Sequence, residues 1–202
     1  VNLHASLLPQ YRGAAPMNWA IINGEKNTGL TTFLLDENVD TGKILMSEQV
    51  EIGNEETLGE LHDKMKIIGA ELLLKTVNAL KNNNIIANNQ DNFIEKNIVL
   101  KKAPRIFRKD CKIDWNNNCI TIFNKIRGLS PYPAAFTELT LDNGKNICLK
   151  IFKASYEIVS NKYIAGNIYT DNKSFLGVGT YDGIVFLKVV FLQQSQKIHY
   201  NG

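Results

Sequence analysis

The stretch Asn2-Leu-His-Ala-Ser-Leu-Leu-Pro-Gln-Tyr-Arg-Gly-Ala-Ala-Pro16 is the most informative part of this chain of 202 residues. Asn2 and His4 stand two residues apart at the end of an apolar, strand-like segment, so their side chains project to the same side. A second segment, Asp-Glu-Asn-Val-Asp-Thr-Gly at 36–42, places Asp40 in a loop bounded by Gly42 and able to close over the pair. Asn, His and Asp together, with no Ser, Thr or Cys placed as a nucleophile, indicate direct group transfer without a covalent intermediate.

These two segments resemble the folate-dependent formyltransferases. The pattern of that family is Asn-x-His-x-Ser-Leu-Leu-Pro-x-Tyr/Phe-Arg/Lys-Gly, with Leu/Val-Asp-Thr-Gly downstream. Every element is present here, in Asn2–Gly13 and Val39–Gly42. The stretches Ile113-Asp114-Trp115 and Arg127–Pro133 extend the resemblance to the methionyl-tRNA formyltransferases, over the later two-thirds of their length.

The resemblance implies an α/β fold, in which an incomplete Rossmann-like formyltransferase domain is followed by a small OB-like β-barrel. Because Val1 directly precedes the motif, we expect a fragment that lacks the N-terminal part of the catalytic domain. The predicted domains are the C-terminal half of the catalytic domain at 1–93, a basic linker at 94–112, and an OB-like tRNA-binding domain at 113–202.

Local patterns predict the elements of both domains. Pro16 opens a short helix, and Thr57 with Glu60 forms a capping box at the start of a long helix that ends near Leu80. Apolar and β-branched runs predict strands in the first part at 1–4, 30–35 and 44–50. In the second part we predict a helix at 120–127, strands at 135–141, 147–152, 165–170, 175–179 and 184–192, and hairpin turns at Asp142-Asn143-Gly144 and Asp182-Gly183.

The resemblance assigns the catalytic roles to Asn2, His4 and Asp40. Asn2 and His4 would donate hydrogen bonds to the oxygen of a tetrahedral intermediate, and Asp40 would hold the His4 ring and accept the proton of the attacking amine. It also implies a cis Leu8–Pro9 bond. The loop that shapes the folate and substrate pocket would consist of Ser6, Leu7, Leu8, Pro9, Tyr11, Arg12, Gly13, Thr41 and Gly42. Of these, Arg12 is the candidate contact for a substrate phosphate or carboxylate.

The reaction implied by the resemblance moves a formyl group from 10-formyltetrahydrofolate to the amino group of initiator methionyl-tRNA. No metal is needed, and the cysteines at 111, 119 and 148 lack metal-ligand spacing. No apolar run reaches the roughly 18 residues of a membrane span, so we expect a cytoplasmic protein with no membrane partner. We expect it to be a monomer.

Charge is distributed unevenly along the chain, and this distribution indicates where a polyanion would bind. Residues 1–95 hold 7 Lys and Arg against 13 Asp and Glu, whereas residues 96–153 hold 12 against 4. An acidic half joined to a basic half predicts contact with nucleic acid through the basic half. The candidate tRNA-binding residues are Lys101, Lys102, Arg105, Arg108 and Lys109.

Two other functions remain open at this point. The same chemistry could act on an amino-sugar nucleotide, because sugar formyltransferases share the first domain and also carry a small C-terminal barrel; water as acceptor would give a hydrolase. The chain could also be a non-catalytic RNA-binding fragment, if its α/β half cannot bury a core without further strands. The excess of Lys and Arg in residues 96–153, which we call the basic block, favours tRNA over sugar.

Overall fold

The computed structural model describes residues 1–202 except 95–97, 141–143, 145, 160–161 and 194–202. Contacts within the chain divide it into two compact units, Val1–Phe107 and Arg108–Gly202. Among the described helices, none is long and apolar enough to cross a bilayer.

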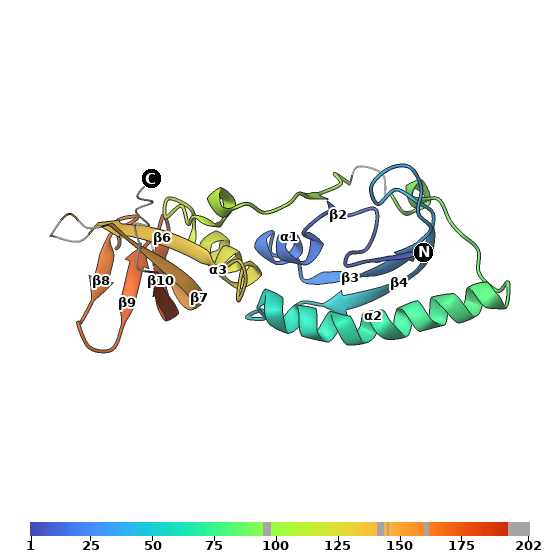
Figure 1. The fold of residues 1–202 in the computed structure, drawn as a ribbon. Coiled ribbons are helices and arrows are strands. Elements are labelled where there is room, and N and C mark those ends of the chain that lie inside the picture. Colours follow the sequence, from blue (N-terminus) through green and yellow to red (C-terminus); the bar gives the residue numbers. More distant parts are fainter. Residues whose placement is uncertain (95–97, 141–143, 145, 160–161, 194–202) are drawn as a thin grey trace, which may run out of the picture. The chain divides into compact units, whose positions relative to one another are not determined.

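The first unit is built on a three-stranded antiparallel sheet (Figure 1). Its strands lie in the order β1 (Asn2–His4), β3 (Asn27–Phe33) and β4 (Ile44–Glu51). Asn2 pairs with Phe33 and His4 with Thr31, so the motif is fixed to the central strand of this sheet. A separate two-residue parallel pair joins β2 (Arg12–Gly13) to β5 (Lys102–Ala103).

Two helices pack with this sheet. Helix α1 (Pro16–Ile22) begins at the predicted proline, and α2 (Leu58–Lys81) begins at the predicted capping box of Thr57 and Glu60. The buried side of α2 includes Leu61, Met65 and Leu72, which share one core with residues of β3 and β4. Gly69 lets α2 approach β1 closely, since a Cβ there would lie 3.0 Å from the Leu3 side chain. A short 3₁₀ helix, η1 (Gln90–Phe93), follows.

The second unit is a five-stranded antiparallel sheet that curls into a half-barrel (Figure 1). It begins with the 3₁₀ helix η2 (Arg108–Cys111) and α3 (Cys119–Gly128), which packs on the sheet through buried Ile122 and Ile126. The strands are β6 (Ala135–Thr140), β7 (Asn146–Ile158), β8 (Ile168–Thr170), β9 (Leu176–Gly179) and β10 (Gly183–Gln193), in the order β6-β7-β10-β9-β8.

The predicted fold class is therefore confirmed: a mixed α/β unit precedes a curled antiparallel sheet. Strand β7 is longer than predicted and continues to Ile158, because its outer half pairs with β10 as far as Gly183. The turn at Asp182-Gly183 leads into β10 as expected. The predicted turn at Asp142-Asn143 lies outside the described residues.

Candidate active site

His4 and Asp40 meet at the end of β1. The His4 ring is buried, with 7% of the residue exposed, and its Nδ1 lies 3.6 Å from Asp40 Oδ2. This distance is too long for a direct hydrogen bond, but it is within the range of an ion pair between the carboxylate and a protonated ring. The sequence prediction that the loop at 36–42 brings its acid to the histidine agrees with this geometry.

The other nitrogen of His4 is held by the backbone. His4 Nε2 lies 2.9 Å from the Tyr11 carbonyl oxygen, which can only accept a hydrogen bond, so Nε2 carries a proton. In the neutral ring this leaves the lone pair on Nδ1, next to the Asp40 carboxylate. Nδ1 is therefore the nitrogen that can take up a proton, and Asp40 lies where it can hold that proton in place.

The position of Asp40 depends on close backbone packing at two glycines of the motif, Gly13 and Gly42. Its Oδ2 accepts a hydrogen bond from Gly13 N at 3.0 Å, and Asp40 itself has a left-handed backbone with φ of 56°. Two residues later, a Cβ on Gly42 would lie 1.6 Å from the Leu34 carbonyl oxygen. Gly13 has φ of 128°, and a Cβ there would lie 2.4 Å from the Ala103 carbonyl oxygen. Both motif glycines are thus required by close packing of the backbone.

Gln90 holds the loop that carries Asp40 through buried hydrogen bonds, and no sequence pattern identified it. The residue is 3% exposed, and its Nε2 donates to the Asp40 and Gly42 carbonyl oxygens at 2.9 and 2.8 Å. Its Oε1 accepts from Arg12 Nε and Nη2 at 3.0 and 2.6 Å. Gln90 thereby joins Arg12 to the Asp40 loop. The residues around Gln90 are polar and rich in Asn, so the local sequence does not mark Gln90 as a buried residue. Its partners lie 48 to 78 positions away.

The loop between β1 and β2 is fixed by hydrogen bonds to β3 and within itself. Thr31 Oγ1 donates to the Ser6 carbonyl oxygen at 2.7 Å and accepts from Leu8 N at 3.1 Å. Ser6 Oγ donates to the Gln10 carbonyl oxygen at 2.6 Å. The Leu8–Pro9 bond is cis, as predicted. Thr31 is a second buried residue that the motif did not identify.

Asn2 differs from His4 and Asp40 because it is exposed. Its Oδ1 accepts from Leu3 N at 2.9 Å. Among the hydrogen bonds found between described residues, none uses the side-chain amide N–H groups of Asn2, which leaves them able to bind an incoming oxygen. No group of three or more His, Cys, Asp or Glu side chains suited to a metal ion occurs in the same described ranges.

Tyr11 anchors the carbonyl that holds His4. Its hydroxyl donates to Glu25 Oε1 and accepts from Asn23 Nδ2, and Lys101 Nζ lies 2.6 Å from the same Glu25 oxygen. Burial, together with the hydrogen bond to Glu25, raises the pKa of Tyr11 well above its usual value. Burial alone would raise the pKa of Glu25, but the hydrogen bonds from Lys101 and Tyr11 outweigh it, so the pKa of Glu25 is lowered.

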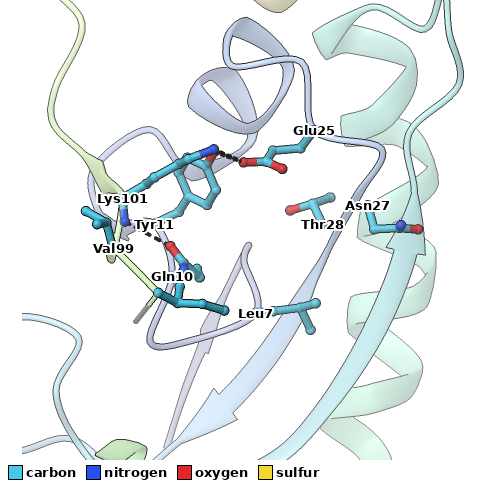
Figure 2. A pocket seen from close by; sticks show the side chains of 9 residues that line it. Leu7, Gln10, Tyr11, Glu25, Asn27, Thr28, Val99 and Lys101 are labelled. Atoms are coloured by element: carbon cyan, nitrogen blue, oxygen red, sulfur yellow. Dashed lines mark hydrogen bonds and ion pairs between the residues drawn. The ribbon is translucent and has the colours of Figure 1, made fainter. Parts of the chain in front are cut away.

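This Tyr11–Glu25–Lys101 cluster lines a cavity of about 280 Å³ (Figure 2). Thr28 is 4% exposed, and its hydroxyl, which points into the cavity in Figure 2, has no partner among the described residues. A cavity of this size can hold a water molecule that bonds to such a hydroxyl and to the polar side chains beside it. We therefore interpret the cavity as part of the support of the loop rather than as a substrate site.

Substituting Glu25 by Gln tests whether the Tyr11–Glu25–Lys101 cluster stabilises the loop between β1 and β2. The amide oxygen can still accept from Tyr11 and Lys101, but the charge is lost, and we expect about 1 kcal/mol lower stability at pH 7. Because the pKa of Glu25 is lowered in the folded state, the wild-type advantage is present above its usual pKa of 4.5. It declines as the pH falls through the folded-state pKa. Urea unfolding of both proteins at pH 7, 5 and 3.5 measures the difference.

Glu71→Gln is the matched control, because Glu71 is exposed on α2 and its change removes the same charge. Its effect on stability should be close to zero at pH 7. A Glu25→Gln effect that stays constant from pH 7 to 3.5 would contradict the assigned role of the carboxylate.

The candidate tRNA-binding residues are all exposed, and they belong to both units. Lys101 lies beside Glu25, as described above, and the guanidinium of Arg105 lies 5.6 Å from the Phe107 ring centroid. In the second unit, the guanidinium of Arg108 lies 5.1 Å from the ring centroid of Phe136. Within the first unit, Lys101 and Lys102 are hydrogen-bonded to the motif loop, so this part of the predicted linker is structured.

Comparison with known sequences gives two family matches and a set of close relatives. Residues 1–77 match the family described as formyl transferase, and residues 105–201 match the formyl transferase C-terminal domain. The chain is 44% identical over 200 residues to the methionyl-tRNA formyltransferase of Phocaeicola vulgatus, covering 99% of the chain and 61% of that protein. It is 46% identical over 198 residues to that of Azobacteroides pseudotrichonymphae, covering 98% and 61%. The chain thus spans about three fifths of these relatives.

Solved structures share the fold at lower identity. An N-formyltransferase from Helicobacter canadensis, in complex with folinic acid and dTDP-3-aminofucose, superposes with a TM-score of 0.69 at 22% identity, over 94% of this chain and 65% of the other. HypX from Aquifex aeolicus, in complex with tetrahydrofolic acid, gives a TM-score of 0.65 at 20% identity, over 92% and 30%. At such identities the likeness concerns the fold alone.

Proposed function

Since the chain belongs to the formyltransferase family, as its motif predicted, we propose that it carries the catalytic residues of an enzyme that formylates initiator methionyl-tRNA for translation initiation. The formyl donor is 10-formyltetrahydrofolate. The observation that carries the proposal is the buried His4–Asp40 pair beside the free amide of Asn2. Relatives that are 40–46% identical and bear the name methionyl-tRNA formyltransferase support the acceptor.

The proposed reaction needs no covalent intermediate with the protein. The methionyl amine attacks the formyl carbon, a new C–N bond forms, and the bond between that carbon and N10 of the folate breaks. The side-chain amide of Asn2 donates to the oxygen that becomes negative, and such a donor typically contributes about 10²–10³ in rate. The His4 and Asp40 side chains take the proton that the amine loses and return it to the folate nitrogen.

A single chain supplies all three residues, so the proposed mechanism requires no second copy, consistent with a monomer. Charged tRNA is a cytoplasmic substrate, and we place the reaction there. The proposal assigns tRNA contact to the exposed basic residues from Lys101 to Lys109, mainly through phosphates.

The salt dependence of tRNA binding tests this assignment. We expect the triple variant Lys102→Gln, Arg105→Gln, Lys109→Gln to bind initiator tRNA more weakly. The log–log salt slope should flatten by roughly 0.9 for each lost contact with a duplex phosphate. Lys101 stays unchanged in the variant because Glu25 already pairs with it. Filter binding at several salt concentrations gives both quantities.

The control is a triple variant of exposed lysines outside the basic block, Lys43→Gln, Lys75→Gln and Lys81→Gln. It changes the net charge by the same amount and should leave the slope close to that of the wild type. An unchanged slope in the first variant, or equal losses of affinity in both variants, would show that Lys102, Arg105 and Lys109 do not bind tRNA.

A further inference from the structure

The guanidinium of Arg12, the candidate contact for a substrate phosphate or carboxylate, is bound within the protein. Arg12 is half-buried, and its Nε and Nη2 donate to Gln90 Oε1 at 3.0 and 2.6 Å. Two N–H groups of one planar cation thus converge on a single amide oxygen, and hydrogen bonds from a charged donor are stronger than neutral ones. Among the ion pairs between described residues, none joins Arg12 to a carboxylate. The partner of this cation is therefore the Gln90 amide.

This contact decides which way the Gln90 amide points. A guanidinium can only donate hydrogen bonds, whereas the carbonyl oxygens of Asp40 and Gly42 can only accept them. With Oε1 towards Arg12, the Gln90 Nε2 faces both carbonyl oxygens, at 2.9 and 2.8 Å. The reversed amide would place donor against donor at Arg12 and acceptor against acceptor at the loop. Arg12 therefore selects the orientation in which Gln90 holds the Asp40 loop.

The backbone next to Arg12 holds the carboxylate of Asp40. Gly13 follows Arg12 in β2, and its N–H donates to Asp40 Oδ2 at 3.0 Å. Gln90 holds the backbone of the same aspartate, so Arg12 is connected to Asp40 on both sides. These contacts form a closed ring, and they fix Asp40 Oδ2 at its position 3.6 Å from His4 Nδ1.

We propose that Arg12 is a positioning residue for the formyl transfer, and that it acts through Gln90 to hold the Asp40 carboxylate beside His4. The inference rests on the proposed function for the reaction that is measured, and it gives Arg12 a task that needs no contact with substrate. Small displacements of a catalytic group are costly, so loss of this task lowers turnover and leaves substrate binding almost unchanged. A guanidinium that bound a substrate phosphate or carboxylate would affect KM instead.

The first test is the kinetics of Arg12→Met, in the chain completed to the length of its relatives. We expect kcat to fall about ten-fold, while KM for 10-formyltetrahydrofolate and for methionyl-tRNA stays within about two-fold. Lys43→Met is the matched control, because it removes a cation from an exposed side chain close to Asp40 in the sequence. Its kcat should stay within about two-fold. A KM raised about ten-fold for either substrate, with kcat of Arg12→Met near that of the wild type, would overturn the proposal.

A double-mutant cycle tests whether Arg12 acts through Gln90. If it does, the variant with both Arg12→Met and Gln90→Met should turn over about as slowly as Gln90→Met alone, because one change breaks the link that the other would break. Effects that multiply, to about 100-fold, would show that the two residues act independently and would contradict the proposal.

Urea unfolding of the 202-residue chain gives a second readout that needs no substrate. Both single variants should unfold at lower urea than the wild type. The midpoint of the double variant should be no lower than that of Gln90→Met, because Arg12 has already lost its acceptor in that protein. Losses of stability that add up in the double variant would rule out the link between Arg12 and Gln90.

The outcomes also separate this inference from the proposed function. If methionyl-tRNA is formylated but the two substitutions act independently, Arg12 is not a positioning residue and the proposed function stands. If no tRNA is formylated, the proposed function fails, and the unfolding midpoints decide whether Arg12 holds the Gln90 amide.

Discussion

His4→Ala should lower the turnover of formyl transfer by at least about 10², with a smaller change in KM. The substitution removes the nitrogen that lies 3.6 Å from Asp40 and can take up a proton. It leaves Asn2 and the backbone of β1 in place, so the substrates can still bind. The measurement is kcat and KM with 10-formyltetrahydrofolate and initiator methionyl-tRNA, for the chain completed to the length of its relatives.

His62→Ala is the matched control for this substitution. His62 lies on α2 with 59% of its side chain exposed, far in sequence from the motif. Its removal should leave kcat within about two-fold, because substitutions of exposed side chains outside the catalytic residues are usually nearly neutral. Near-normal turnover of His4→Ala would remove His4 from the mechanism, whatever the control shows.

Gln90→Met should have the largest effect on stability, about 3 kcal/mol, and should lower kcat about ten-fold or more. The apolar side chain of similar length leaves the carbonyl oxygens of Asp40 and Gly42 and the guanidinium of Arg12 without the bonds that Gln90 provides. The Asp40 loop then loses its fixed position, and small displacements of a catalytic group are costly. Urea unfolding and the transfer assay measure the two effects.

Gln90→Glu separates the hydrogen bonds that the Gln90 amide donates from those that it accepts. A carboxylate can still accept from Arg12, but it cannot donate to the two carbonyl oxygens, so we expect it to be destabilising as well. Gln49→Glu, on the exposed side of β4, makes the same chemical change and should be nearly neutral. A Gln90→Glu protein as stable and active as the control would show that the donated hydrogen bonds do not hold the Asp40 loop.

Sequence patterns predicted the elements where the signal is local. The capping box of Thr57 and Glu60 fixed the start of α2, and Pro16 that of α1. The spacing of Asn2 and His4 placed both on one side of a strand, and the motif predicted which loop would bring an acid to them. In the structure, Asp40 indeed lies next to His4. The catalytic roles of the three residues remain predictions.

The support of the site could not be read from the sequence. Gln90, Glu25 and Thr31 each act on a loop that lies 14 or more positions away, and nothing near them in the sequence marks those partners. Composition predicted a linker from 94 onward, yet Lys101 bonds to Gln10 and Glu25 in the first unit. A basic residue can serve structure or nucleic acid, and only its contacts separate the two.

The most direct test of the proposed function is formyl transfer with a choice of acceptors. The chain, completed to the length of its relatives, would be offered labelled 10-formyltetrahydrofolate with initiator methionyl-tRNA, an amino-sugar nucleotide or water alone. We predict label on the methionyl amine, and at least about 100-fold less of it with His4→Ala at the same enzyme concentration within the same time. Label on the sugar, or released only as formate, would contradict methionyl-tRNA as the acceptor.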